Sequence, residues 1–112
     1  MINIDSKIFK ALQNSDNGEV DDETRFYYHQ EKNRIWAEYS GGDIVKGHLL
    51  GKQLKDGSLD FVYHHINQKG EVKIGKCLSK ILTLEDGRLK LIERWQWLCD
   101  DMLCGESELI EV

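Results

Sequence analysis

A regular series of turn signals constrains this chain more than any other feature. The signals fall at residues 16–18, 32–33, 41–43, 55–57, 68–70, 85–87 and 99–101. Asp-Gly, Asn-Gly and Gly-Gly-Asp favour tight hairpins, because glycine and asparagine tolerate positive φ. The segments between the signals have the length of hairpin strands and leave no room for the crossover that a parallel pair needs. The chain is therefore predicted to fold as a meander of consecutive antiparallel strands.

The segments between the turns alternate in character. Residues 88–98 read RLKLIERWQWL, and one face of this segment carries Leu89, Leu91, Glu93, Trp95 and Trp97. In LDFVYHHIN, one face carries Leu59, Phe61, Tyr63 and His65. A period of two with one apolar face indicates strands that are buried on one side. Further strands are predicted over residues 24–30, 34–40, 43–52, 71–84 and 105–112.

The first segment, residues 5–14, is ambiguous on its own. Asp5 or Ser6 could cap a short helix with Ile8, Ala11 and Leu12 on one side, and the same residues could form a strand.

A meander of about eight to ten strands has two exposed edges, and closing the sheet removes them. Gly47, Gly51 and Gly75 inside predicted strands suit the bends of a closed sheet. The sequence thus predicts an all-β, antiparallel, closed or nearly closed small barrel of lipocalin or avidin architecture. We expect one domain over residues 1–112.

Composition excludes several partners. The net charge is −5 and no basic stripe lies along one face, so neither nucleic acid nor an anionic membrane is an expected partner. No apolar run approaches the roughly 20 residues that span a bilayer, and the start lacks the pattern of a signal peptide. We therefore expect a cytoplasmic protein.

Its three cysteines are an odd number, which argues against a disulfide framework.

Several segments, among them NSDNGEV, IWAEYSGG, LEDGRLKL and GES, resemble a family of small bacterial β-proteins that are commonly labelled N-acetylglutamate synthase or uncharacterised. The resemblance runs over nearly the whole chain and implies a strand over residues 7–14. The sequence departs from the family at LCDDMLC (98–104), where a polar turn is usual, and at Lys80, where proline is usual. Acetyl transfer on the usual fold needs a glycine-rich loop that opens a helix. No such loop is present, so we expect the label not to describe an activity.

The adjacent histidines His64 and His65 are predicted to point in opposite directions, because neighbours on a strand do. His65 shares the inward face with Tyr63, as either a hydrogen-bonded core residue or a polar group in a ligand cavity. Cys77 could face His65 across the turn at 68–70. A zinc site needs three or four ligands, and no CxxC or HxH pattern supplies them. Neither a metal nor a cofactor is predicted.

Glu93 is the most informative side chain, since it sits on the apolar face of its strand. A buried carboxylate costs several kcal/mol unless it is paired or protonated. Glu93 is therefore predicted either to pair with an interior arginine, tyrosine or histidine, or to contact a ligand. If His65 lies close to it, the two could act as an acid/base pair.

Three functions follow from these residues. The first is a binding protein that holds a small organic ligand, or a peptide end, with Tyr63, His65, Glu93, Trp95 and Trp97 as its ligand-binding residues. The second is an enzyme that uses Glu93 and His65. The third is a packed structural or oligomerisation module.

Two loops complete the predictions. The carboxylates of residues 19–24 and 99–108 are predicted to be solvated loop charge. Cys99 and Cys104 flank an apolar turn, Met102-Leu103, which could contact a second subunit of a homo-oligomer. Free surface thiols are the alternative.

Overall fold

The fold is a closed antiparallel barrel of eight strands, described here from a computed structural model that covers residues 1–112. The strands are β1 (Ile8–Asn14), β2 (Arg25–Glu31), β3 (Arg34–Gly41), β4 (Ile44–Gln53), β5 (Leu59–Asn67), β6 (Val72–Thr83), β7 (Leu89–Trp97) and β8 (Cys104–Glu111). The predicted all-β meander is confirmed. The helix considered for residues 5–14 was wrong, because β1 occupies most of that segment. The structure contains no helix of a length and apolarity that would cross a membrane.

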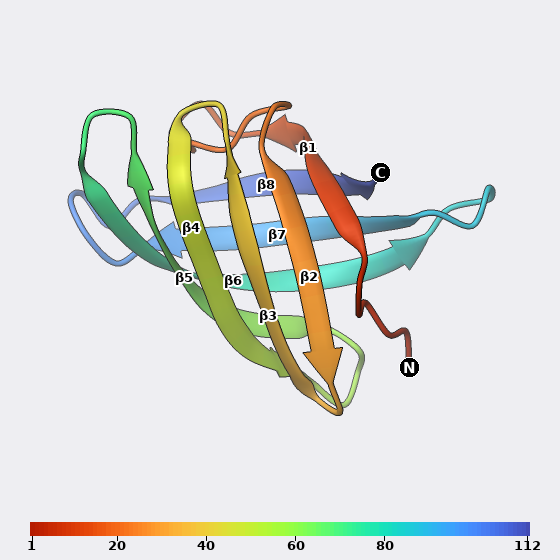
Figure 1. The fold of residues 1–112 in the computed structure, drawn as a ribbon. Helices are drawn as coiled ribbons and strands as arrows, with labels where there is room; N and C mark the ends of the chain where they lie inside the picture. The colour runs from red at the N-terminus through yellow and green to blue at the C-terminus, as the bar shows by residue number, and fades with distance from the viewer.

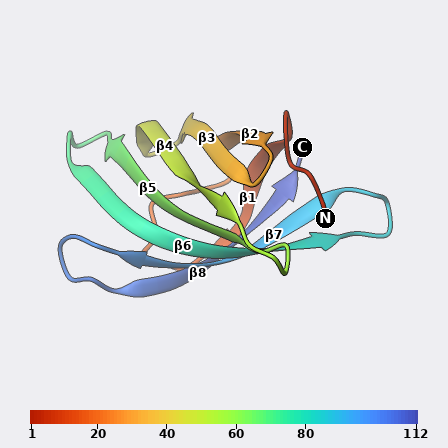
Figure 2. The same cartoon turned by 90° about the horizontal axis from the view of Figure 1, so that it is seen from below.

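Every strand pairs with its neighbour in sequence, and β1 pairs with β8 to close the ring. In Figure 1, β2, β3 and β4 run steeply across the more horizontal β6, β7 and β8 on the opposite wall. Figure 2 shows these two walls from below. The barrel has no free sheet edge, which is the problem that closure was predicted to solve.

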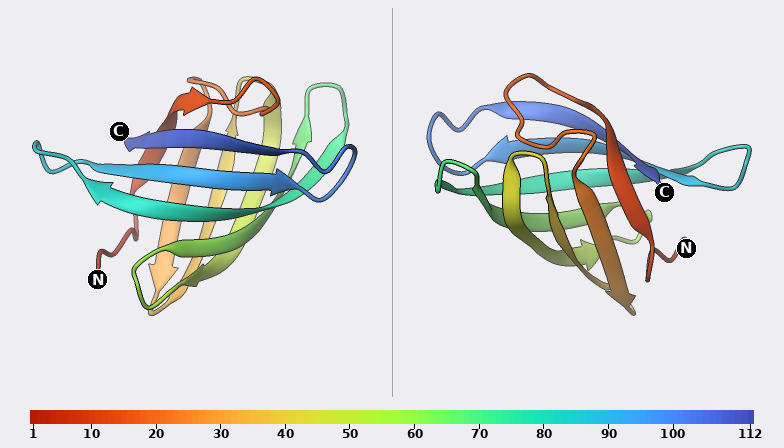
Figure 3. Two further views of the ribbon diagram at one scale, coloured as in Figure 1. Left: turned by 180° about the vertical axis from the view of Figure 1, so that it is seen from behind. Right: turned by 45° about the horizontal axis from the view of Figure 1, so that its top comes forward.

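The seam between β1 and β2 is short. Only Ile8, Phe9 and Lys10 pair with β2, opposite Tyr27, Phe26 and Arg25. The rest of β1 pairs only with β8 and leads into the connection of residues 15–24, hereafter the mouth loop, which crosses the top of the barrel (Figure 3, right). Most hairpin loops have two to five residues, so this connection is long for its place.

The inward faces of the strands fill the interior as the alternation predicts. On β5, Leu59, Phe61 and His65 are buried, whereas Val62 and His64 are exposed. Gly75 lies opposite Tyr63, and a Cβ added there would come within 2.3 Å of the Tyr63 ring. This glycine therefore makes room for an inward ring, a role that the prediction of bends had missed.

The end of the barrel opposite the mouth loop is plugged by the N-terminal segment. Ile4 is fully buried there. Its backbone N–H donates to the Gln30 Oε1 atom at 3.0 Å, and the Gln53 amide donates to the Ile2 carbonyl at 2.8 Å. Neutral amides and apolar packing thus close this end, and the candidate site lies at the other.

Candidate functional site

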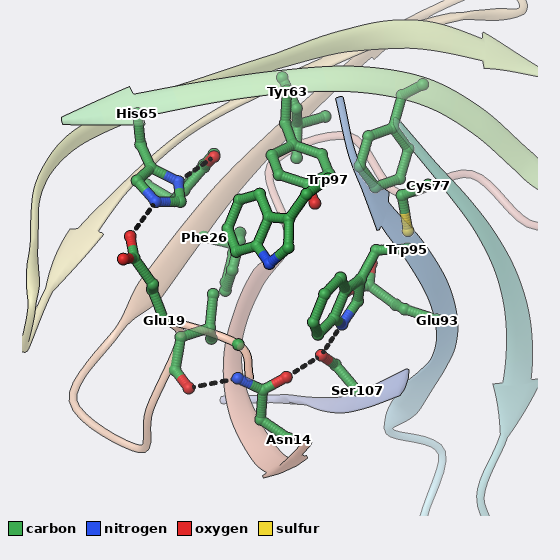
Figure 4. Close-up of a pocket in the computed structure, with 15 residues that line it drawn as sticks. Asn14, Glu19, Phe26, Tyr63, His65, Cys77, Glu93, Trp95, Trp97 and Ser107 are labelled. Carbon is green, nitrogen blue, oxygen red and sulfur yellow. Dashed lines mark hydrogen bonds and ion pairs between the residues drawn. The ribbon is translucent and has the colours of Figure 1, made fainter. Parts of the chain in front are cut away.

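A cavity of about 40 Å³ lies beneath the mouth loop, and nine of its fifteen lining residues are hydrophobic. All five predicted site residues line it: Tyr63, His65, Glu93, Trp95 and Trp97. The lining residues that the sequence did not indicate include Asn14, Glu19, Val20, Tyr39 and Ser107. Figure 4 shows β5 and β7 side chains meeting residues of the mouth loop around this space.

His65 is held from both sides. Its Nδ1 atom lies 3.0 Å from the Tyr39 hydroxyl and its Nε2 atom lies 2.8 Å from the Glu19 carboxylate. Burial lowers the pKa of His65, while Glu19 opposes the shift. Burial also raises the pKa of Tyr39, so its hydroxyl keeps the proton that it donates to Nδ1. The neutral imidazole then donates its Nε2–H to Glu19.

The prediction that the carboxylates of residues 19–24 are solvated loop charge was wrong for Glu19. The Glu19 side chain is 19% exposed and binds both His65 and Asn67, the latter through its Nδ2 atom at 3.0 Å. The sequence carries no local signal for this pairing, because His65 is 46 residues away.

Cys77 does not face His65. Across the β5–β6 ladder, Phe61 is the partner of Cys77 and Lys73 is the partner of His65. The prediction that Cys77 could face His65 was wrong, because the residue of β6 opposite His65 lies four positions before Cys77. No group of three or more His, Cys, Asp or Glu side chains is arranged to hold a metal ion.

Glu93 is buried and lines the cavity, and its Oε2 atom has no hydrogen-bond partner. Burial raises the pKa of Glu93 to about 8. The hydroxyl of Ser79, its partner across the β6–β7 ladder, opposes this shift without reversing it. Glu93 is thus largely a neutral carboxylic acid at pH 7, able to donate and accept a hydrogen bond. The predicted pairing with a buried arginine, tyrosine or histidine is absent.

Glu93 and His65 border the same cavity without a hydrogen bond to each other. Both imidazole nitrogens of His65 are already committed, to Tyr39 and Glu19. The acid/base pair considered from the sequence is not assembled in this arrangement.

The two tryptophans of β7 bind the mouth loop to the barrel wall. The Trp97 indole N–H donates to the Asn17 carbonyl at 3.2 Å. The Trp95 indole donates to the Ser107 hydroxyl at 2.8 Å, and Ser107 is hydrogen-bonded to Asn14. Asn14 in turn donates to the Val20 carbonyl at 2.8 Å (Figure 4). The loop is therefore the roof of the cavity.

The cysteines divide by burial. Cys77 is buried, which raises the pKa of its thiol, whereas Cys104 is exposed. All three are free. Met102 and Leu103, in the turn between β7 and β8, are each about half exposed, as a contact patch would require.

A family model described as "Avidin-like protein" matches residues 2–112 of the chain. No curated protein and no solved structure matches it. The matched range includes every strand of the barrel and every residue that lines the cavity.

Proposed function

The chain belongs to the avidin-like protein family, and from this premise we propose that it is a binding protein that holds a small organic ligand inside its barrel. Proteins of this family bind small ligands such as biotin. An eight-stranded barrel is wide enough for its side chains or for one small ligand. The ligand would lie against Tyr63, Trp95 and Trp97, with His65 at the mouth and Glu93 at the floor.

The unpartnered carboxyl of Glu93 carries this proposal. A buried polar atom without a partner costs about 1–3 kcal/mol, and native proteins rarely leave one without a reason. Glu93 sits in an aromatic cavity, and aromatic walls with a few convergent polar groups are typical of ligand pockets. A ligand that hydrogen-bonds to Glu93 would remove the cost.

The size of the cavity adds a condition. At about 40 Å³ it has room for a few water molecules, whereas ligand pockets are typically about 300–1,000 Å³. Gly18, Glu19 and Val20 of the mouth loop line the cavity, so an outward movement of this loop would create the missing space. Ligand binding is therefore expected to displace the roof and to leave the barrel unchanged.

Native mass spectrometry of protein purified from its own host tests the proposal, with retained small molecules as the expected result. A fluorescence titration complements it, with biotin and metabolite mixtures as probes and Trp95 and Trp97 as reporters. Glu93→Gln should weaken binding, whereas Glu85→Gln, on an exposed turn, should not. If no molecule is retained and no probe changes the fluorescence, the protein is not a binding protein of this kind.

An enzyme on the same barrel is supported by one observation. A carboxylic acid with a pKa of about 8 is suited to proton transfer near neutral pH. His65 lacks a free nitrogen to act as its partner. The N-acetylglutamate synthase label has no support in these residues, and the cytoplasmic location stays a prediction.

A homo-oligomer is the second part of the proposal. Avidin-like proteins often form oligomers, and the half-exposed Met102 and Leu103 offer an apolar contact. Light scattering during size-exclusion chromatography should give more than one chain per particle, and Leu103→Lys should reduce that number. A monomeric wild-type protein would contradict this part alone.

A further inference from the structure

We propose that the ligand is a small carboxylic acid with an apolar body, that its carboxylate binds to His65 and Asn67, and that Glu19 occupies this receptor in the absence of ligand. The inference rests on the proposed binding function and names its ligand class. Glu19 then competes with the ligand for the same hydrogen-bond donors. The mouth loop covers the cavity and also occupies the donors of His65 and Asn67.

The receptor is visible in the contacts of Glu19. His65 Nε2 lies 2.8 Å from the Oε1 atom of Glu19, and Asn67 Nδ2 lies 3.0 Å from its Oε2 atom. His65 and Asn67 are two residues apart on β5 and therefore share its inward face. One strand thus offers one donor to each carboxylate oxygen, and hydrogen bonds to an ionised acceptor are stronger than neutral ones.

Neither donor depends on Glu19 for its orientation. The Tyr39 hydroxyl fixes His65 through Nδ1. The Asn67 Oδ1 atom accepts the backbone N–H groups of Lys69 and Glu71, each at 3.0 Å. The second Asn67 amide hydrogen is taken by the Glu71 carboxylate at 3.0 Å. Each donor therefore keeps one free hydrogen when Glu19 leaves, and both hydrogens point to the vacated position. Such preorganisation favours binding because little order must be created.

A cation stands beside the receptor. Lys73 is the partner of His65 across the β5–β6 ladder, and its side chain is 15% exposed. Its ammonium group bonds to Asp100, which is the main cause of its raised pKa, and the charge of Glu19 adds to the shift. A carboxylate in the position of Glu19 would have the same favourable neighbour.

The residues next to Glu19 indicate the rest of the ligand. Val20 packs against the hydrophobic core, and Gly18 and Val20 both line the cavity. A molecule that replaces this stretch of the loop would put its body against Phe26, Tyr63 and Trp97. These walls are aromatic, so the part of the ligand between its carboxylate and the group that contacts Glu93 is expected to be apolar. The loop can leave without breaking the β1–β2 ladder, because that ladder ends at Lys10 and Arg25.

Calorimetric titration with matched acid and amide probes tests the inference. The probes are 3-phenylpropionate and 3-phenylpropanamide, with hexanoate and hexanamide as a second pair. The variants are Glu19→Ala, Glu19→Gln and the control Glu23→Ala, which removes an exposed carboxylate from the same loop. We expect the acids to bind about tenfold or more tightly to Glu19→Ala than to wild type, because a competing state has been removed. The amides should gain less, and Glu23→Ala should behave as wild type.

Nuclear magnetic resonance gives a second reading that does not depend on affinity. The Trp97 indole N–H donates to the Asn17 carbonyl, so its resonance should shift when an acid displaces the loop. Thermal unfolding of each variant checks that it is folded. If Glu19→Ala does not fold, the same titrations are made with Glu19→Gln.

Two results would overturn the inference and leave the binding function standing. One is equal strengthening of acid and amide binding, or no strengthening, in Glu19→Ala. The other is a molecule retained from the host that carries no acidic group. If neither probes nor host molecules bind to any variant, the binding function fails as well.

Discussion

The two ends of the barrel are closed in different ways. At the far end, Ile4 is fully buried, the side-chain amides of Gln30 and Gln53 bond to the backbone, and one exposed carboxylate, Asp5, accepts the Gln30 backbone N–H. At the mouth end, the loop is held by the Glu19 carboxylate and the Trp97 indole, and a cavity remains beneath it. The far end is part of the core, whereas the mouth end combines ionisable contacts with an unfilled space.

This difference indicates that the far end mainly stabilises the barrel, whereas the mouth end is suited to binding. Apolar packing gives closure that does not depend on pH and cannot be exchanged for a ligand. Polar contacts to a loop can be exchanged, because another molecule can offer the same groups. Glu93, which lines the cavity at the mouth end, has an unpartnered carboxyl oxygen and therefore lowers the stability of the folded protein.

Truncation of one side chain at each end tests most directly whether the two ends contribute differently to stability. Ile4→Ala should lower the free energy of unfolding by about 2–5 kcal/mol, because it leaves a cavity in a fully buried position. Val20→Ala, in the partly buried mouth loop, should cost less than about 1 kcal/mol. Urea unfolding of both variants measures the difference. Equal losses would show that the mouth loop belongs to the core as fully as the N-terminal segment does.

The pH dependence of stability tests the cost of Glu93. Its pKa in the folded protein is about 8, above the value of an exposed glutamate, so the folded state binds the proton more tightly than the unfolded state. The associated stability is present at low pH and is lost as the pH rises from about 4.5 to 8. The loss should reach about 3 kcal/mol between pH 5 and pH 8.

Glu93→Gln should remove this dependence, because the amide does not ionise over that range. His65 has its pKa lowered and acts in the opposite sense, so its contribution is lost as the pH falls. The comparison of wild type and Glu93→Gln at each pH therefore isolates the carboxyl. A flat difference between the two proteins would mean that Glu93 is not buried as described.

Loss of one loop contact should give the smallest change. Trp97→Phe removes the donor to the Asn17 carbonyl and should cost about 1 kcal/mol. Amide hydrogen exchange should become faster at Gly18 in the mouth loop and stay unchanged at Lys7, beside the N-terminal plug. Faster exchange at both positions would show that the two ends open together.

The sequence predicted the barrel well because the signals for it are local. The alternation of Leu89, Leu91, Glu93, Trp95 and Trp97 places all five inside, and each predicted turn from 32–33 onward joins two neighbouring strands. The candidate site, in contrast, is formed by contacts between residues that are far apart in the sequence. The roof over His65 comes from residues about 45 positions earlier, and the acidity of that segment concealed the role of Glu19. Space inside a barrel depends on how all side chains pack together, so the small cavity could not be derived from alternation.

The ladder between β1 and β8 has a consequence for how the protein folds. It pairs Phe9 with Glu111, so the ring closes only once β8, about 100 residues further along the chain than β1, is available. Pairing over such a sequence distance is slow, and an unclosed sheet presents two unpaired edges. Until β8 pairs, a seven-stranded sheet leaves the outer edges of β1 and β7 unpaired, and unpaired strand edges favour aggregation.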